Sequence, residues 1–393
     1  VNMYTFTIYM TTGCNFKCKY CYENYKKCNQ LDGTKLIDTI EFIMNYSKRD
    51  KILLDFLGGE PLLKKDLIYN AVEYIKRNYS DRIVKYYITT NGSLLDDKFI
   101  EFMQENSFTI RLSFDGNKKT HDLNRVAKDG NSCYENILKN IEKVKNSGIA
   151  YAVRMTVAEN TVPYMYENIC FLHERGLNNI CMIMDVNLKL TEQRMKILEQ
   201  QVKKITKYYI NEYIKGNKFS LDQFDGKLLN VLCDFGGKFC MCNAGITNFK
   251  IMPNGDIYPC GFLTNDKKFA IGNISTSINI EKAHNIAISN YDKENRACLD
   301  CKIRDFCHGM KCGYMNFINT GKINVPSDAE CKCEKIFFNG IKEIMSFYSE
   351  LSTQEIKKNL GSYIELIKRN GYKFSQYGEA INDRIVWAEK SKK

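Results

Sequence analysis

Six strand-like segments alternate with helix-like segments over the first 190 residues, and this alternation constrains the fold more than any other feature of the sequence. Strands that alternate with helices pair in parallel, because each helix carries the chain back across the sheet. The possible architectures are an open doubly wound sheet and a full or partial barrel. Strands are expected at 5–12, 52–58, 85–91, 109–115, 151–158 and 180–187, and helices at 35–47, 66–78, 97–106, 134–147 and 163–175.

The rest of the chain divides into three further parts. Residues 191–224 hold one long amphipathic pattern at 192–216, which predicts a bridging helix. Residues 225–335 contain ten of the 17 cysteines with little periodicity, which is typical of a region folded around metal rather than an apolar core. Residues 336–393 return to helical spacing. The predicted domains are therefore 1–190, 191–224, 225–335 and 336–393.

Composition excludes several classes of protein. No apolar stretch approaches the roughly 20 residues that cross a membrane, and residues 1–10 do not resemble a secretory signal. Without such a signal, clustered cysteines favour metal binding over disulfides. The net charge of +11 has no polybasic run or nucleic-acid motif behind it, so a solvated basic surface or an acidic peptide partner is expected, with no nucleic acid and no membrane.

Three cysteines follow the first strand at C-x3-C-x2-C spacing, as Cys14, Cys18 and Cys21. Three thiolates from one short loop can hold three corners of a four-iron cluster, which leaves the fourth iron open to a small molecule. A loop at this place lies where barrel enzymes gather their active sites, at the carboxyl ends of the strands. The spacing therefore predicts a cluster that takes part in catalysis.

Loops with binding potential follow the next strands as well, which favours the partial barrel over the open sheet. Gly58-Gly59-Glu60-Pro61 follows the second strand, where the glycines would let a ligand approach the backbone and Glu60 could accept from an ammonium group. Asn91-Gly92 ends the third strand and Ser113-Phe114-Asp115-Gly116 the fourth. Arg154 on the fifth strand could pair with a carboxylate. Taken alone, each of these loop segments reads as an ordinary turn between a strand and a helix.

Together these motifs make the sequence resemble the radical S-adenosylmethionine enzymes over residues 5–190. The resemblance implies a partial (β/α)6, TIM-like barrel and reductive cleavage of S-adenosylmethionine to a 5′-deoxyadenosyl radical that removes a hydrogen atom from the substrate. It assigns Cys14, Cys18 and Cys21 to a radical-generating [4Fe-4S] cluster. The residues it implies for S-adenosylmethionine binding are Tyr20, Gly58, Gly59, Glu60, Asn91, Ser113 and Arg154.

The later cysteines form a second field. Structural zinc is one reading, but only Cys298 and Cys301 form a C-x2-C pair, and His308 is the one imidazole nearby. The order is similar to the SPASM extension of the same enzymes, which implies two auxiliary [4Fe-4S] clusters and so a C-terminal cysteine-rich iron–sulfur domain followed by helices. Four residues between Cys307 and Cys312 depart from the usual three.

The resemblance implies two sets of auxiliary ligands. The first is Cys233, Cys242, Cys260 and Cys312, with Cys240 as the alternative to Cys233; the second is Cys298, Cys301, Cys307 and Cys331, with Cys333 as the alternative to Cys331. A missing ligand would leave an open iron for a substrate thiolate. The cysteines outside both fields are Cys28, Cys133, Cys170 and Cys181, of which the last three are expected to be buried free thiols and Cys28 has no assignment.

SPASM-containing enzymes act mostly on peptides and proteins, and two readings compete. One is a maturase that cross-links a ribosomal peptide, as a cysteine thioether of the sactipeptide or ranthipeptide type. The alternative is an anaerobic sulfatase-maturing, formylglycine-forming enzyme, which the stretches at 121–125 and 258–260 resemble. That group places an aspartate base after the equivalent of Cys260, where this chain has Gly261, with Asp266 elsewhere. The departure favours the thioether maturase.

A non-catalytic redox or zinc adaptor is a minor alternative. The implied partners are a precursor peptide with a leader, which is cysteine-rich if thioethers form, and an electron donor such as flavodoxin or ferredoxin. Only 13 residues precede Cys14, which leaves no room there for a leader-binding domain, so a separate leader-binding protein is considered too. Oxygen-sensitive clusters imply the cytoplasm of an anaerobe.

Overall fold

The computed structural model describes residues 3–23, 28–47, 51–234, 240, 242–307 and 312–390 of the 393-residue chain. All six predicted strands are present, pair in parallel in chain order, and are followed by a short seventh. The mixed α/β fold predicted from the sequence is confirmed. The strands are β1 Tyr4–Tyr9, β2 Lys51–Leu57, β3 Ile83–Thr90, β4 Thr109–Ser113, β5 Ala150–Val157, β6 Asn179–Met184 and β7 Ser220–Leu221.

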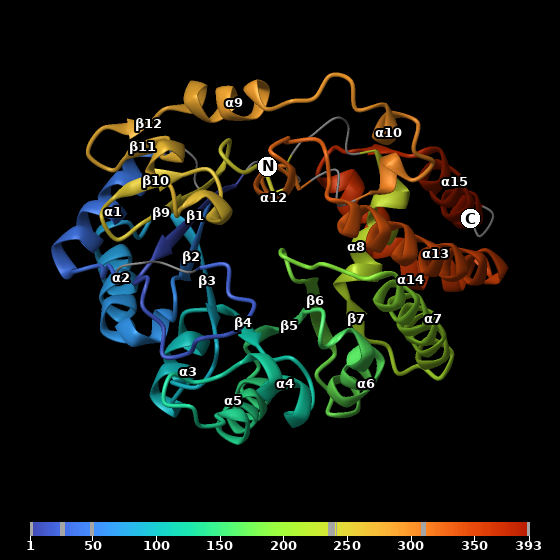
Figure 1. Ribbon diagram of the computed structural model, residues 1–393, viewed down its shortest axis with the longest axis horizontal. Helices are drawn as coiled ribbons and strands as arrows, with labels where there is room; N and C mark the ends of the chain where they lie inside the picture. Colours follow the sequence, from blue (N-terminus) through green and yellow to red (C-terminus); the bar gives the residue numbers. More distant parts are fainter. Residues whose placement is uncertain are drawn as a thin grey trace.

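Helices cover the outer side of these strands (Figure 1). Their buried residues recur every three or four positions, and the side chains of Asp32, Asp96 and Asn117 cap the starts of α1, α3 and α4. Helix α4 was not predicted, because its seven residues lack an apolar repeat. The helices are α1 Gly33–Tyr46, α2 Lys65–Asn78, α3 Asp97–Glu105, α4 Lys118–Asn124, α5 Tyr134–Asn146 and α6 Met165–Glu174, with short 3-10 turns η1 Pro61–Lys64 and η2 Val162–Tyr164.

The sheet does not stop at β1 but continues into the cysteine-rich region. Strand β9, Asn248–Ile251, pairs in parallel with β1, and three antiparallel strands follow it, giving the order β12-β11-β10-β9-β1-β2-β3-β4-β5-β6-β7. Four strands of two to four residues were too short to read from periodicity. The further elements are β10 Asp256–Tyr258, β11 Gly272–Asn273, β12 Ser277–Ile278, α9 Ile280–Ser289, α10 Arg296–Leu299 and α12 Gly313–Thr320, with turns η3 Gly261–Leu263, η4 Lys267–Phe269 and η5 Arg304–Phe306.

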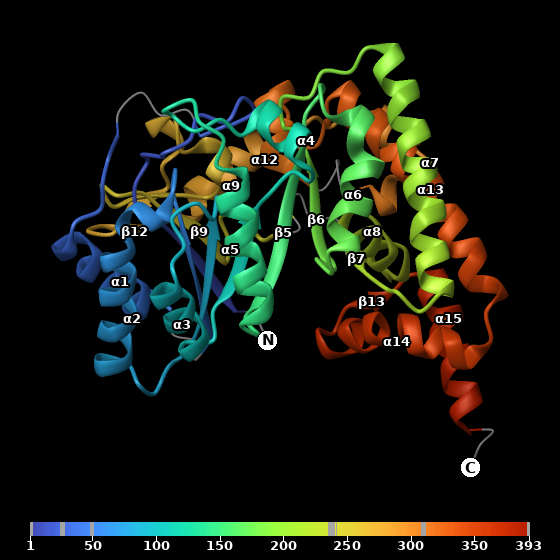
Figure 2. The ribbon, with the colours of Figure 1, turned by 90° about the horizontal axis from the view of Figure 1, so that it is seen from below.

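The C-terminal helices pack beside β6 and β7, away from α1 and α2 (Figure 2). Helix α13 lies against α7 and α8, and Lys227 of α8 donates to both carboxylate oxygens of Glu334 of α13 in a buried ion pair. Helix α8 crosses the predicted boundary at 224, and α13 begins before the predicted boundary at 336. These elements are α7 Glu192–Ile214, α8 Asp222–Leu232, α13 Asp328–Glu350, α14 Thr353–Arg369 and α15 Gln376–Lys390, with β8 Cys233–Asp234 pairing with β13 Lys373–Phe374.

Within the described residues, no helix combines the length and the apolar character that crossing a membrane requires.

Candidate active site

The cysteine loop leaves the carboxyl end of β1 and is held in place by the segment after α4. Backbone hydrogen bonds run from Lys17 N–H to the Val126 carbonyl at 2.8 Å and from Lys19 N–H to the Asn124 carbonyl at 2.9 Å. The N–H of Phe16 donates to Cys14 Sγ at 3.3 Å. A separate part of the chain therefore positions the loop that carries Cys14, Cys18 and Cys21.

The three thiols of this loop are electrostatically coupled. Desolvation raises the pKa of Cys14 to about 12 and that of Cys21 to about 11, and in both cases the neighbouring cysteines add to the rise. Desolvation also raises the pKa of Cys18, while the guanidinium of Arg125 beside it acts in the opposite direction. Thiols this close become thiolates together only if a cation neutralises them, which is what iron would supply.

The donor set therefore suits a four-iron cluster with three protein ligands. As they stand, no three Cys, His, Asp or Glu side chains of the described residues lie close enough together to hold a single metal ion. The fit rests on donor chemistry and mutual proximity of the thiols.

The glycines after β2 dock directly on the cysteine loop. Gly59 N–H donates to the Thr11 carbonyl and Glu60 N–H to the Gly13 carbonyl, both at 2.9 Å. A Cβ at Gly58 would lie 2.2 Å from the Thr11 oxygen, and one at Gly59 would lie 2.2 Å from the Gly13 oxygen. The sequence prediction gave these glycines to a ligand, whereas in the structure a neighbouring backbone makes the close approach.

The carboxylate of Glu60 is engaged by its own chain. Its Oε1 accepts from the Thr90 hydroxyl at 2.6 Å and from Leu62 N–H at 3.0 Å, and its Oε2 accepts from Asn91 N–H at 2.8 Å. Glu60 is 1% exposed, and this burial raises its pKa to about 7. Whatever ligand it meets, Glu60 ties the loop after β2 to the loop after β3.

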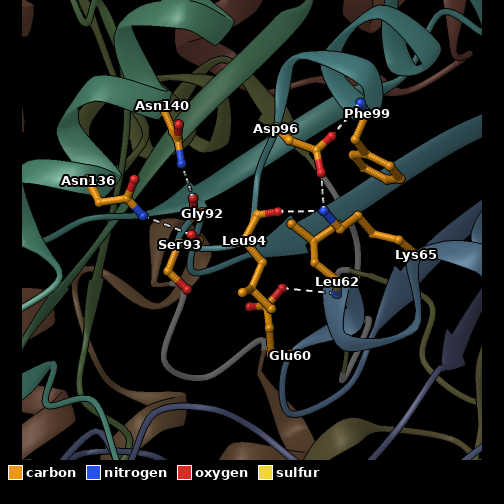
Figure 3. Close-up of polar contacts among 10 residues, drawn as sticks. All are labelled: Glu60, Leu62, Lys65, Gly92, Ser93, Leu94, Asp96, Phe99, Asn136 and Asn140. Atoms are coloured by element: carbon orange, nitrogen blue, oxygen red, sulfur yellow. Dashed lines mark hydrogen bonds and ion pairs between the residues drawn. The ribbon is translucent and has the colours of Figure 1, made fainter. Parts of the chain in front are cut away.

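The loop after β3 is anchored from both sides (Figure 3). Asn140 and Asn136 of α5 donate to the carbonyls of Gly92 and Ser93 at 2.9 and 2.8 Å. On the other side, Lys65 donates to the Leu94 carbonyl at 2.8 Å and pairs with Asp96. These anchors were not identified from the sequence, because polar residues on a helix give no signal of which loop they reach.

Asn91 joins the third loop to the cysteine loop. Its Nδ2 donates to Asn15 Oδ1 at 2.9 Å, and Asn15 in turn donates to the hydroxyl of Ser93 at 2.9 Å. The loops after β1, β2 and β3 thus form one hydrogen-bonded assembly. The sequence predicted that they meet, and the structure brings them together.

Tyr20 is fixed by the loop after β4. Its hydroxyl donates to Asp115, which also accepts from Arg125 at 3.0 Å and from Thr156 N–H at 2.9 Å. Asp115 is 1% exposed and the Arg125 guanidinium stacks over the Tyr20 ring at 5.4 Å. The sequence predicted no contact between Tyr20 and either Asp115 or Arg125, because no spacing in the sequence pairs these residues.

Ser113 and Arg154 stand opposite one another in the register of β4 and β5. Both side chains are partly exposed, on the face of the sheet away from the helices. This places the two predicted cofactor contacts next to each other at the carboxyl ends of their strands.

Among the later cysteines, four gather in one place. Cys240 and Cys312 form a backbone bridge, and the pKa of Cys312 is raised by burial and then by Cys260, Cys240 and Cys242. Burial likewise raises the pKa of Cys260 to about 12, with Cys242 and Cys240 contributing.

Cys233 lies apart from that set, although the sequence interpretation preferred it. It is 2% exposed within the main hydrophobic core and pairs with Phe374 across β8 and β13. The packing therefore favours Cys240, the alternative to Cys233 in the first auxiliary ligand set. The reason is topological: residue 233 ends α8, and no spacing rule reveals that the chain packs there.

In the second predicted ligand set, Cys298, Cys301 and Cys307 lie on α10 and around η5, and Cys331 lies on α13. Cys301 N–H donates to the Cys298 carbonyl at 3.3 Å, and Cys307 follows after η5. Burial raises the pKa of Cys331, and Cys298 and Cys301 contribute to the rise, whereas the pKa of Cys333 responds to Glu334 and Glu330 after burial. Cys333 is 4% exposed in the core. These neighbours favour Cys331 over Cys333. His308, the one imidazole of the zinc reading, lies outside the described residues.

The position after Cys260 has no room for an acidic side chain without a shift. A Cβ at Gly261 would lie 3.0 Å from the hydroxyl of Tyr9. That hydroxyl donates to Glu23 at 2.9 Å. Asp266 instead pairs with Lys268 at the surface and caps η4.

Comparison with known proteins agrees with this geometry. Residues 8–163 match the model of the radical SAM superfamily. The cysteine-type anaerobic sulfatase-maturating enzyme of Clostridium perfringens is 26% identical over 323 residues, which are 76% of this chain and 86% of that protein. The serine-type enzyme of Bacteroides thetaiotaomicron is 23% identical over 384 residues, which are 88% of this chain and 91% of that protein.

A solved structure has the same fold. Native anSMEcpe with bound AdoMet and the Cp18Cys peptide superposes with a TM-score of 0.73 at 23% identity, covering 87% of this chain and 97% of that chain.

Proposed function

Because residues 8–163 of this chain form a radical SAM domain, we propose that the protein is a radical S-adenosylmethionine enzyme that modifies a side chain of a peptide or protein. The observation that carries this is the single assembly of the loops after β1, β2 and β3, which joins the cysteine loop to Glu60 and Asn91. Such an assembly would hold a cluster and its ligand in fixed relation.

When bound, S-adenosylmethionine and a reduced [4Fe-4S] cluster supply a 5′-deoxyadenosyl radical that takes a hydrogen atom from the substrate. Cys14, Cys18 and Cys21 would hold that cluster. Ser113, Arg154 and the loop at 58–60 would orient the cofactor, with Arg154 facing its carboxylate. Asp115 positions Tyr20 and Arg125 around the cysteine loop.

Formylglycine formation in a sulfatase is the first candidate reaction. Anaerobic sulfatase-maturating enzymes of both the cysteine type and the serine type align over most of this chain. These relatives favour formylglycine formation, whereas Gly261 in the sequence favours the thioether maturase. For a cysteine substrate the oxidation removes two electrons: one would leave with the hydrogen atom taken by the 5′-deoxyadenosyl radical, and one would pass to an auxiliary cluster as a proton is lost. Water would then replace the sulfur of the resulting thioaldehyde, which releases hydrogen sulfide and leaves the aldehyde.

A thioether cross-link in a ribosomal peptide is the second candidate, and one observation favours it. Position 261 carries no carboxylate, and a Cβ there already meets Tyr9. An enzyme that deprotonates its substrate from this position would need another group. If one auxiliary cluster had one cysteine ligand fewer than the four proposed below, its open iron would ionise the substrate thiol, and no side-chain base at position 261 would be needed.

One experiment separates these reactions. The anaerobically reconstituted protein is incubated with S-adenosylmethionine, dithionite and either a cysteine-containing peptide with a sulfatase sequence or the product of a neighbouring short cysteine-rich gene. Loss of sulfur from the peptide, detected by mass spectrometry, supports formylglycine formation. Loss of two hydrogens with sulfur retained supports the cross-link. Absence of 5′-deoxyadenosine from the reduced, iron-loaded protein would falsify the enzyme proposal.

We further propose two auxiliary [4Fe-4S] clusters, at Cys240, Cys242, Cys260 and Cys312, and at Cys298, Cys301, Cys307 and Cys331. A flavodoxin or ferredoxin would supply the first electron, and a separate protein is one candidate for binding the leader of a leader-dependent peptide. Oxygen-sensitive clusters accord with an anaerobic cytoplasm.

A further inference from the structure

The inner face of the curved sheet is not filled by its own side chains. On β2, β4 and β5 the residues that face the helices are buried, while the alternate residues facing inward are partly exposed. Val153 and Met155 are at most 1% exposed, for example, whereas Arg154 between them is partly exposed. In a closed barrel of eight strands, layers of side chains fill this space. Here the space is accessible to a ligand.

One layer of this inner face is polar on strand after strand. In the register of the sheet, Thr7 of β1 stands between Lys250 of β9 and Asp55 of β2. Lys250 Nζ donates to the Thr7 hydroxyl at 2.8 Å, and that hydroxyl donates to Asp55 Oδ2 at 3.1 Å. Asp55 is followed in register by Tyr87 of β3, over whose ring the guanidinium of Arg111 lies at 5.7 Å.

The inner face is also polar at levels nearer the carboxyl ends of the strands. Arg111 of β4 stands opposite Thr89 of β3, and Ser113, one level higher on β4, stands opposite Arg154. Arg154 of β5 stands opposite Cys181 of β6. Cys181 Sγ donates to Asp222 Oδ2 at 3.0 Å, and Asp222 Oδ1 accepts from Met182 N–H at 2.7 Å, so this carboxylate is engaged. Of the carboxylates near the arginines, Glu23 is bound to Tyr9 as well.

The two arginines of this inner face lack the carboxylate partners that buried guanidinium groups usually have. In the part of the chain that the structure describes, neither the Arg111 nor the Arg154 guanidinium has a hydrogen-bond or ion-pair partner. Lys250, Arg111 and Arg154 all act on Asp55, whose Oδ1 is buried without a partner among the described residues. Guanidinium groups inside proteins normally bind carboxylates or phosphates. Two carboxylates lie near these cations, Asp55 and Glu23, and they accept from the hydroxyls of Thr7 and Tyr9. Among the described residues neither forms an ion pair with the Arg111 guanidinium, which leaves room for a further carboxylate.

We propose that Arg111 and Lys250 form a subsite for a carboxylate of the peptide substrate, next to the place where Arg154 faces the cofactor. This rests on the proposed function, and it names the substrate class: a peptide with an acidic residue, or a free carboxyl end, close to the residue attacked. Arg111 lies two positions before Ser113 on β4, so the subsite is one layer below the cofactor contacts. It would orient the peptide while the neighbouring residue reaches the radical.

The test measures binding to the holoenzyme, reconstituted with iron and supplied with S-adenosylmethionine. The probes are N-acetylated, C-amidated, fluorophore-labelled pentapeptides with a central cysteine, in which the adjacent residue is Glu, Gln or Lys. A further Gln peptide has a free C-terminus. Fluorescence anisotropy gives each Kd. We expect the Glu peptide to bind at least about tenfold tighter than the Gln peptide, as for a charge-assisted hydrogen bond.

Charge reversal sharpens the test. Arg111→Glu is expected to prefer the Lys peptide over the Glu peptide, and Arg111→Gln is expected to lose the preference even if the reversal does not fold. Arg77→Glu, at an exposed position in the last turn of α2, is the matched control and should keep the preference.

Equal binding of the Glu peptide, the amidated Gln peptide and the free C-terminal Gln peptide to the wild type would overturn the subsite, as would a preference for the carboxylate that persists in Arg111→Gln. Tight binding of the free C-terminal peptide would instead identify the chain end as the source of the carboxylate, and would support the subsite. Failure of the proposed function is detected separately, by 5′-deoxyadenosine formation, which binding does not require.

Discussion

The hydroxyl of Tyr20 donates to Asp115 at 2.5 Å, which joins two residues 95 positions apart. Tyr20 belongs to the cysteine loop after β1, and Asp115 lies in the loop after β4. One buried carboxylate therefore ties these two loops together. The same carboxylate binds Arg125 and the backbone of Thr156.

Replacing this carboxylate should impair the radical cluster. Asp115→Asn would turn an amide N–H₂ toward Arg125 or Tyr20 and leave buried donors unpaired, at a cost of roughly 1–3 kcal/mol. We expect at least about tenfold slower 5′-deoxyadenosine formation, with less iron bound per protein. Tyr20→Phe removes a single hydrogen bond and should do less. Normal iron content and rate in Asp115→Asn would show that Asp115 does not position the loop.

Gly59 should tolerate no side chain. In Gly59→Ala the new Cβ would lie 2.2 Å from the Gly13 oxygen, which is backbone and cannot rotate away. We expect the two loops to separate and S-adenosylmethionine affinity to decrease more than tenfold, measured by equilibrium dialysis. Gly33→Ala is the matched control, because nothing lies within 4 Å of its added Cβ at the start of α1. Similar affinities for the two variants would contradict the docking argument.

The two candidate ligands Cys233 and Cys240 can be told apart by iron content. Cys240→Ser should lose one cluster's iron and sulfide, because Cys240 lies with Cys242, Cys260 and Cys312. Cys233→Ser should keep its iron, although a buried hydroxyl in the core will reduce stability. The reverse pattern would restore the interpretation made from sequence.

The buried ion pair between α8 and α13 should be sensitive to loss of one partner. Lys227→Met leaves the Glu334 carboxylate buried without its cation, which costs about 3–5 kcal/mol. The measurement is urea unfolding of the reconstituted protein, followed by circular dichroism. The double variant Lys227→Met/Glu334→Leu should recover much of that loss. A double variant as unstable as the single one would argue against an uncompensated charge as the cause.

Glu60 should make stability depend on pH. Burial raises its pKa from 4.5 to about 7 in the folded protein, so the folded state binds this proton more tightly than the unfolded chain. The free energy of unfolding should therefore be highest below about pH 4.5 and decrease as pH rises through about 7, by on the order of 3 kcal/mol. Thermal unfolding of wild type and Glu60→Gln between about pH 5 and pH 8 checks this. The Gln variant should have a smaller slope, and the remaining slope should come from Glu23 and Glu330, whose pKa values burial raises to about 7 and about 8. An identical slope in both proteins would assign it to other groups.

The strands and most helices of the first half could be predicted because apolar residues repeat there with periods of two and 3.6. The meeting of the first three loops followed from parallel topology, since all their strands end at one edge. What Glu60 and the two glycines do could not be predicted, because Thr90, Asn91, Thr11 and Gly13 reach them only through folding.

The second cysteine field shows a stricter limit. Spacing grouped Cys298 with Cys301, but it could not choose between Cys233 and Cys240, which lie seven positions apart. The place of Cys233 beside β13 depends on Phe374, which is far away in sequence. The inner polar layer was missed for the same reason: Lys250, Thr7 and Asp55 are neighbours only in the register of the sheet.

The pairing of β9 with β1 has a consequence for how the protein is made. During synthesis, β1 leaves the ribosome first, yet its outer neighbour is encoded about 240 residues later. Until β9 arrives, one edge of the first strand offers unpaired N–H and carbonyl groups to any other strand, which is a route to aggregation. The nascent chain is therefore most vulnerable over the time needed to translate residues 10–247, and a truncation before β9 would make that vulnerability permanent.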